Sequence, residues 1–129
     1  MKIPEGYLYT QEHEWAKVED GEALFGLTAY ATDQLGGITF IDLPENGSPV
    51  TQAEPFAEVE SVKAVSDIYA PASGKITEVH EQLSEQPELI DADPYRNGWI
   101  CRVKLSDASE LEDLMDPGDY EDYVAELDD

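Results

Sequence analysis

The most regular alternation of apolar and polar positions lies beside Lys63, near the middle of the chain. Within residues 56–62, small or branched apolar side chains alternate with glutamates, which is the period of a strand with one face turned inward. Residues 65–69 are rich in valine, isoleucine and tyrosine, which favour strands, and a turn-forming stretch follows at 70–74. The pattern predicts a hairpin with Lys63 near its tip, then a turn and another strand over 75–79.

The sequence before this hairpin predicts further short strands and one helix. The strands are expected over 7–10, 15–18, 23–27 and 38–43. Residues 28–36 have helical character, because Thr28 is a good N-cap and Ala31 and Leu35 lie one turn apart. Gly36 suits the left-handed exit from such a helix.

Helical spacing replaces the strand pattern after Leu105. A first helix is predicted near Ser109, with Ser109 as its cap and Glu112 at the third position of a capping box. A second helix begins at Pro117, since proline is favoured at a first helical position. This helix is expected to dock on the strands through an apolar stripe made of Tyr120, Tyr123, Val124 and Leu127.

The 129 residues suffice for one domain with a substantial core. We expect a single, mainly β domain over 1–129, with strands over about 7–105 and helices over about 109–127. A weak near-repeat relates residues 38–56 to residues 76–90, each running from a strand through a polar loop and a proline to another apolar segment. Two such halves can form the two sheets of a flattened barrel, with Lys63 on the hairpin between them.

Acidic residues dominate the charge, because 30 Asp and Glu against 7 Lys and Arg give a formal net charge of −23. Such a surface is a poor partner for nucleic acids and for anionic membranes. The acids are spread along the whole chain and 41% of the residues are hydrophobic, which argues against a disordered acidic tail. We hypothesise instead an adaptation to a salt-rich cytoplasm.

Salt is accordingly expected to stabilise the fold. At molar salt the Debye length falls to about 3 Å, so the repulsion among the surface carboxylates would be screened. The melting temperature, followed by circular dichroism, should rise as salt is raised from dilute buffer to molar concentration. A melting temperature that does not change with salt would contradict the hypothesis.

Few residues offer catalytic or metal-binding chemistry. The single cysteine, Cys101, excludes an internal disulfide and lies in an alternating stretch that predicts a buried strand position. The only histidines, His13 and His80, lack metal-ligand spacing, and no glycine-rich phosphate loop is present. We therefore expect no catalytic site and no metal site. The sequence has no apolar run of bilayer length and no secretory-type leader, so a cytoplasmic location is expected.

Lys63 stands out because lysine is rare in so acidic a chain. Its neighbours Val62, Ala64 and Val65 are small or apolar, so no adjacent charge explains it. A flexible stem that ends in a nucleophilic amine suits covalent attachment. A tight turn would let a modifying enzyme reach that amine.

The sequence around Lys63 resembles the lipoyl-lysine segment of the glycine cleavage system H-protein family. The matching residues there are Glu60-Ser61-Val62-Lys63-Ala64, Ser66-Asp67-Ile68-Tyr69-Ala70-Pro71 and Gly74. Further matches run in collinear order from about Tyr7 to about Leu127, including Tyr9-Thr10, Glu12-His13-Glu14-Trp15, Gly26-Leu27-Thr28, Pro87-Glu88-Leu89-Ile90, Asp93-Pro94-Tyr95 and Gly98-Trp99. The resemblance implies a flattened β-barrel or sandwich of the lipoyl- and biotinyl-carrier type (barrel-sandwich hybrid), with a short internal helix and C-terminal helices.

The resemblance also implies a carrier rather than an enzyme. Lipoate would be joined to Lys63 by an amide, as a swinging arm that ends in a dithiolane. In the family this arm accepts an aminomethyl group from glycine decarboxylase (P protein), passes it to the aminomethyltransferase (T protein) and is reoxidised by dihydrolipoamide dehydrogenase (L protein). The redox chemistry belongs to the cofactor. A lipoylating enzyme is the fourth expected partner, and a monomer is expected because the carrier visits several enzymes.

By resemblance, two groups of residues serve the attachment point. The turn read by the lipoylating enzyme is made of Glu60, Ser61, Val62 and Ala64. The pocket that shelters the loaded arm would involve His13, Glu14 and Asp67, where a carboxylate can pair with a cationic amine. Each of these residues could instead be an ordinary turn or surface residue.

Other interpretations stay open at this point. An H-like protein could relay lipoyl groups to other lipoate-dependent complexes, and its attachment segment would look the same. A biotin carrier fits less well, since that family has methionines beside its lysine where this chain has Val62 and Ala64. An unmodified interaction module, in which Lys63 is incidental, would keep its binding in a Lys63→Arg variant. An enzyme would turn over substrate by itself.

Overall fold

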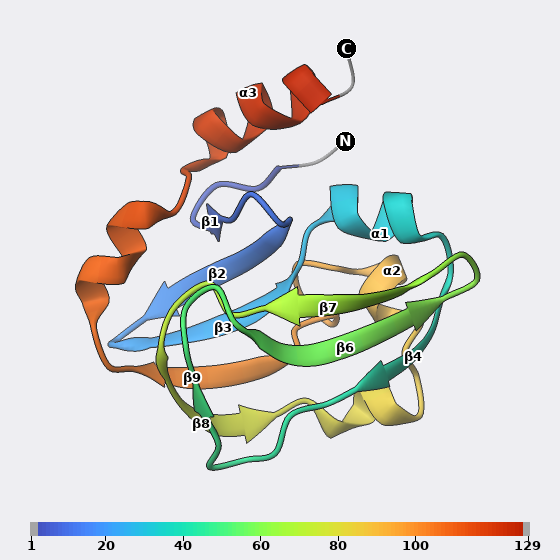
Figure 1. Cartoon of the computed structure of the whole chain (residues 1–129), viewed down its shortest axis with the longest axis horizontal. Helices are drawn as coiled ribbons and strands as arrows, with labels where there is room; N and C mark the ends of the chain where they lie inside the picture. The colour runs from blue at the N-terminus through green and yellow to red at the C-terminus, as the bar shows by residue number, and fades with distance from the viewer. Residues whose placement is uncertain (1–2, 128–129) are drawn as a thin grey trace.

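The computed structural model describes residues 3–127, which form two antiparallel sheets flanked by short helices (Figure 1). The larger sheet has the strand order β1-β2-β3-β9-β8-β5, with bounds Leu8–Tyr9, Glu14–Glu19, Glu22–Leu27, Cys101–Leu105, Gly74–Val79 and Pro49–Val50. The smaller sheet has the order β4-β6-β7, with bounds Ile38–Asp42, Pro55–Ser61 and Val65–Tyr69. The predicted mainly β sandwich is confirmed, and its central hairpin is β6 and β7.

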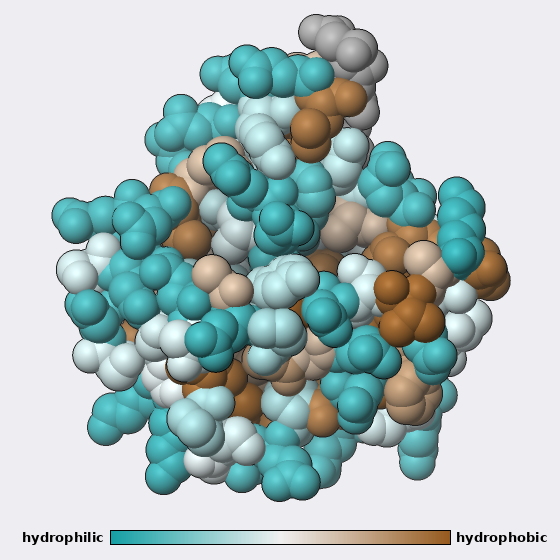
Figure 2. Space-filling model, in the orientation of Figure 1, coloured by the Kyte–Doolittle hydropathy of each residue, from teal (hydrophilic) through white to brown (hydrophobic). Residues whose placement is uncertain are grey.

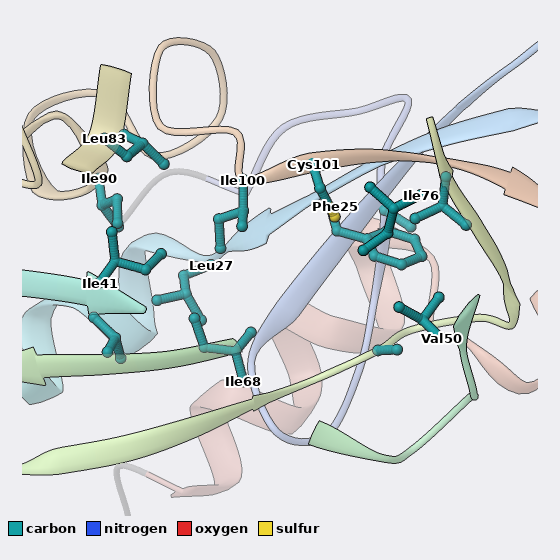
Figure 3. Packing of buried hydrophobic residues seen from close by; sticks show 14 of the residues in the cluster. Phe25, Leu27, Ile41, Val50, Ile68, Ile76, Leu83, Ile90, Ile100 and Cys101 are labelled. Atoms are coloured by element: carbon teal, nitrogen blue, oxygen red, sulfur yellow. The ribbon is translucent and has the colours of Figure 1, made fainter. Parts of the chain in front are cut away.

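The core lies between the two sheets. Figure 3 shows Phe25 of β3 and Ile76 of β8 on one side, and Ile41 of β4 and Ile68 of β7 on the other. All four side chains are buried, so both sheets contribute one apolar face, as the alternation along the strands requires. Cys101 is also buried there, as predicted, and burial raises the pKa of its thiol to about 12.

The near-repeat predicted from the sequence is only partly realised. β4 and β6 of the first half lie in the smaller sheet and β8 of the second half lies in the larger sheet. However, β5 pairs with β8, and the apolar pair after Pro87 lies in helix α2 (Leu89–Ala92). The Lys63 hairpin therefore belongs wholly to the smaller sheet instead of joining two equivalent halves.

Helix α1 (Ala29–Leu35) forms where the sequence signals predict it. Thr28 Oγ1 accepts a hydrogen bond from the Ala31 amide at 3.2 Å, and Gly36 leaves the helix with a φ of 76°. The other helical segments are α2, the 3-10 helices η1 (Glu81–Ser84) and η2 (Ala108–Asp113), and α3 (Pro117–Leu127). Among the described residues, no helix is long and apolar enough to cross a membrane.

The C-terminal region corrects the prediction in two details. The segment near Ser109 is the 3-10 helix η2, and its cap is Asp107, whose carboxylate accepts from the Ser109 amide at 3.0 Å. The Ser109 hydroxyl donates to the same carboxylate at 2.6 Å, so this side chain is engaged rather than capping. In α3, Tyr120 and Val124 are buried but Leu127 is exposed, because the apolar stripe extends beyond the surface that it covers.

Docking of α3 ties the end of the chain to its beginning. The rings of Tyr9 and Tyr120 stack with centroids 4.6 Å apart, and both side chains are fully buried. Just before α3, Met115 exchanges two backbone hydrogen bonds with Tyr9, at 2.9 and 2.8 Å. The turn that follows Tyr9 is thereby held between α3 and the larger sheet.

Candidate functional site

Ser61 builds the tip of the β6–β7 hairpin. Its amide donates to the Ala64 carbonyl at 2.8 Å, and its Oγ accepts from the amides of Lys63 and Ala64 at 3.2 and 3.1 Å. Lys63 itself is exposed and forms no ion pair with any residue in the range 3–127. The serine thus shapes the turn that carries the exposed lysine.

The tip rests on the glycines that follow α1. The Val62 amide donates to the Gly37 carbonyl at 3.1 Å. A Cβ on Gly36 would lie 3.2 Å from Val62 Cγ2 and 3.5 Å from Lys63 Cε, so the lysine stem passes over a position that carries no side chain. Gly36 has a φ of 76° and a ψ of −159°, a backbone conformation that is essentially confined to glycine. The α1 exit therefore supports the lysine as well as ending the helix.

Glu14 is the most unusual carboxylate of the structure, because it is only 2% exposed. Thr10 Oγ1 donates to its Oε1 at 2.5 Å, and the Tyr69 amide donates to its Oε2 at 3.2 Å. Burial raises its pKa to about 7, although these hydrogen bonds to the charged form oppose the rise. At neutral pH Glu14 is therefore divided between its protonated and ionised forms.

Glu14 opens onto a cavity of about 420 Å³. Its walls come from the turn before β2, the end of β7 and the segment after η2. The lining residues are Thr10, Gln11, Glu12, Glu14, Gln52, Ala53, Tyr69, Ala70, Pro71, Asp113 and Leu114. Tyr69 is the last residue of β7, whose other end adjoins the Lys63 tip. One strand thus leads from the exposed amine to the buried carboxylate.

His13 lies beside this cavity but is not among the residues that line it. Its Nδ1 is hydrogen-bonded to the Tyr120 hydroxyl at 2.9 Å, and that hydroxyl is also hydrogen-bonded to Thr28 Oγ1 at 2.8 Å. Burial lowers the pKa of the imidazole, which favours its neutral form. The backbone of His13 has a φ of 72°, so these contacts hold a strained residue next to Glu14.

The three residues predicted to form the arm pocket do not lie together in the structure. Glu14 lines the cavity and His13 stands behind it, while Asp67 lies exposed on the smaller sheet, opposite Glu58. Their assignment to one arm pocket stays a prediction. The turn residues Glu60, Ser61, Val62 and Ala64 do surround Lys63, in the hairpin described above.

The sequence did not indicate which residues form hydrogen bonds with Glu14 and with the histidine before it. Thr10 and Tyr69 supply its hydrogen bonds, and Tyr120 anchors the preceding histidine from 107 positions away. Thr10 and Tyr69 lie within stretches that look distinctive in the sequence, but nothing there indicates that they converge on one carboxylate. The Tyr120 contact has no local signal, because a helical apolar stripe predicts only packing.

A two-sheet β domain that presents one unpaired lysine at the tip of an exposed hairpin has the architecture of the lipoyl- and biotinyl-carrier class. Comparison with known proteins identifies one family within this class. Residues 7–127 match the family model described as glycine cleavage H-protein. The chain belongs to the glycine cleavage H-protein family.

Individual relatives cover nearly the whole chain. It is 48% identical over 127 residues to the glycine cleavage system H protein of Halothermothrix orenii, covering 98% of this chain and 99% of that protein. The H protein of Brevibacillus brevis is 47% identical over 126 residues, covering 98% and 100%. The crystal structure of an H protein from Mycobacterium marinum superposes with a TM-score of 0.85 at 37% identity, covering 97% and 98%.

Proposed function

We propose that this chain is the lipoyl-carrying shuttle of a glycine cleavage system, with lipoate joined to Lys63. The observation that carries the proposal is the presentation of Lys63. The hairpin presents an exposed lysine that forms no ion pair within residues 3–127, in a chain of the glycine cleavage H-protein family. The chain presents and protects the group, and the enzymes that it visits carry out the chemistry.

The attachment chemistry suits an exposed amine. The ammonium of Lys63 would first lose one proton, and the lone pair of the neutral Nζ would then attack the carboxyl carbon of an activated lipoyl group to form a C–N bond. The bond to the activating group would break, that group would leave with the bonding pair, and the nitrogen would lose a second proton. The resulting amide has no charge, so the carrier loses one of its few cations. A lysine buried in an ion pair could not take part so readily.

Strand β7 connects the Lys63 tip to the cavity. Tyr69 lies six positions after Lys63, which is at most about 20 Å at the rise of an antiparallel strand. A lysine side chain spans only part of that distance, so the cavity has a role for the carrier only if the side chain is lengthened. When bound, lipoate would supply a dithiolane that accepts and releases an aminomethyl group.

Glu14 gives the cavity its chemical character. Its ionised form offers a negative charge with little competing water, because the carboxylate is buried. A cationic amine brought next to it would favour ionisation of the carboxyl group and could donate a charge-assisted hydrogen bond to the carboxylate. Thr10 and the Tyr69 amide hold both carboxylate oxygens in place meanwhile. The cavity would shelter the amine from water, which limits loss of the carried group by hydrolysis.

Four partners follow from this role. Glycine decarboxylase would load the carrier, the aminomethyltransferase would unload it, and dihydrolipoamide dehydrogenase would reoxidise it. A lipoylating enzyme would attach the group in the first place. We propose that the chain meets them one at a time as a monomer.

The proposal is tested by the intact mass of the protein purified from its own cells, combined with peptide mapping of residues 53–76. A lipoyl adduct on Lys63 is the expected result. An unmodified Lys63 in cells that are actively breaking down glycine would overturn the proposal and favour an interaction module. Reconstitution with glycine decarboxylase then distinguishes the glycine cleavage carrier from a donor to other lipoate-dependent complexes.

A further inference from the structure

The outer face of the smaller sheet carries an exposed apolar pair beside the lysine. Phe40 of β4, Glu60 of β6 and Val65 of β7 are direct cross-strand partners, so their side chains share one face. The adjacent positions Ile41 and Val59, which pair with each other, are buried and face the core. Phe40 is 48% exposed and Val65 is 59% exposed, although large apolar side chains are usually covered.

A β-bulge directs Phe40 to this face. Ile38 pairs with Ser61, but Phe40 pairs with Glu60, so Thr39 is an extra residue in β4. In a regular strand without this bulge, Phe40 would lie two positions after the buried Ile38 and therefore on the same side of the sheet. Bulges are known to re-aim side chains next to functional sites. In Figure 2, apolar side chains gather at the edge where Figure 1 shows the tip of the β6–β7 hairpin.

A row of carboxylates continues the same face away from the tip. Asp42, Glu58 and Asp67 are cross-strand partners, and all three are exposed. Like charges directly opposite one another destabilise a sheet. No cation within residues 3–127 forms an ion pair with this row. A complementary partner surface would therefore be apolar near the tip and basic farther along the strands.

We propose that this face is the docking surface for the enzyme that attaches lipoate to Lys63. The inference rests on the proposed function. That enzyme must bring its active site to a bare amine, which lies only one lysine side chain from the hairpin backbone. Enzymes that act on the finished carrier work at the far end of a longer arm and need not approach so closely. The attaching enzyme consequently covers Phe40 and Val65, and its lysines or arginines meet the carboxylate row.

The test uses the unmodified full-length chain with an ATP-dependent lipoate ligase and lipoate, and follows the gain of lipoyl mass. The double variant Phe40→Ser/Val65→Ser should lower kcat/KM for lipoylation by about tenfold or more, as expected for central apolar contacts. Val65→Ser alone should lower it less and keeps the test valid if the double variant folds poorly. Val18→Ser is the matched control, because Val18 is an exposed strand valine in the larger sheet.

The carboxylate row is tested separately through salt dependence. Asp42→Asn/Glu58→Gln should lower kcat/KM at low salt and weaken its decline as salt is raised, since steering by opposite charge is screened. Glu121→Gln/Asp122→Asn, on exposed positions of α3, removes the same two charges from another surface and should leave both quantities near the wild-type values.

The possible outcomes separate this inference from the proposed function. Wild-type kcat/KM in the double variant would overturn the docking surface while leaving Lys63 as the attachment site. Normal lipoylation combined with failed loading by glycine decarboxylase would assign the face to that enzyme and would equally overturn the inference. If the wild-type chain gains no lipoyl mass at all, it is the proposed function that fails.

Discussion

Lys63→Arg is expected to abolish carrier activity without unfolding the protein. The arginine keeps the positive charge, but its guanidinium is not a nucleophilic amine and cannot form the lipoyl amide. The variant should gain no lipoyl mass, and glycine-dependent release of carbon dioxide in a reconstituted system should fall to the level seen without carrier. The free energy of unfolding should change by less than about 0.5 kcal/mol, because Lys63 is exposed and unpaired.

Lys75→Arg is the matched control for this experiment. Lys75 is an exposed strand lysine on β8, away from the hairpin tip. Its replacement should leave both lipoylation and glycine cleavage at wild-type levels. Substantial cleavage activity in the Lys63→Arg variant would show that another group carries the aminomethyl unit, and the carrier assignment of Lys63 would then be abandoned.

Glu14→Gln is expected to flatten the pH dependence of stability. The pKa of Glu14 in the folded state is about 7, raised by burial above its ordinary value of 4.5. The folded state therefore binds more protons than the unfolded state between these values, and stability falls as the pH rises through that window. This loss amounts to at most about 3 kcal/mol at pH 8, from 1.36 kcal/mol per pKa unit. Glutamine does not titrate, so it removes this contribution.

The measurement is urea unfolding of the wild type and of Glu14→Gln from pH 5 to pH 8. The two proteins should differ most in slope between about pH 5 and pH 7. Glu121→Gln, at an exposed position of α3 away from the cavity, should retain the wild-type slope. Parallel curves for Glu14→Gln and the wild type would mean that Glu14 titrates normally, and its special role in the cavity would lose its support.

The same variant should weaken the protection of a loaded arm. Without a carboxylate the cavity offers no negative charge to a cationic amine, and such an interaction is worth roughly 1.5–3 kcal/mol. Hydrolytic loss of the aminomethyl group from the loaded carrier should accordingly rise by about tenfold or more at neutral pH. If the variant loses the aminomethyl group at the wild-type rate, Glu14 does not protect the loaded arm, and the arm is sheltered at another part of the surface.

Several elements could be predicted because their determinants are local. The β6–β7 hairpin follows from alternation, β-branched residues and a turn, all within 17 residues of sequence from Pro55 to Pro71. Helix α1 follows from Thr28 and Gly36, whose capping contacts involve only neighbouring turns. The position of Lys63 at the tip needs no knowledge of the rest of the fold.

The cap of η2 shows where local reasoning fails even at short range. Ser109 and Asp107 are both good capping residues, and the sequence favours Ser109 because a glutamate follows it three positions later. In the structure the Asp107 carboxylate engages both the amide and the hydroxyl of Ser109. Both residues could cap the helix, and the carboxylate of Asp107 is the group that does so.

The sequence by itself therefore determined the hairpin, its lysine, the capped helix and, through resemblance, the family. Only the tertiary structure decided which of many carboxylates is special. Glu14 is set apart by burial and by a hydrogen bond from Tyr69, 55 positions away, and neither depends on its local sequence. Likewise Phe40 is exposed because an extra residue in β4 shifts its pairing with β6. Burial and strand register are properties of the assembled sheets, and alternation along one strand does not specify them.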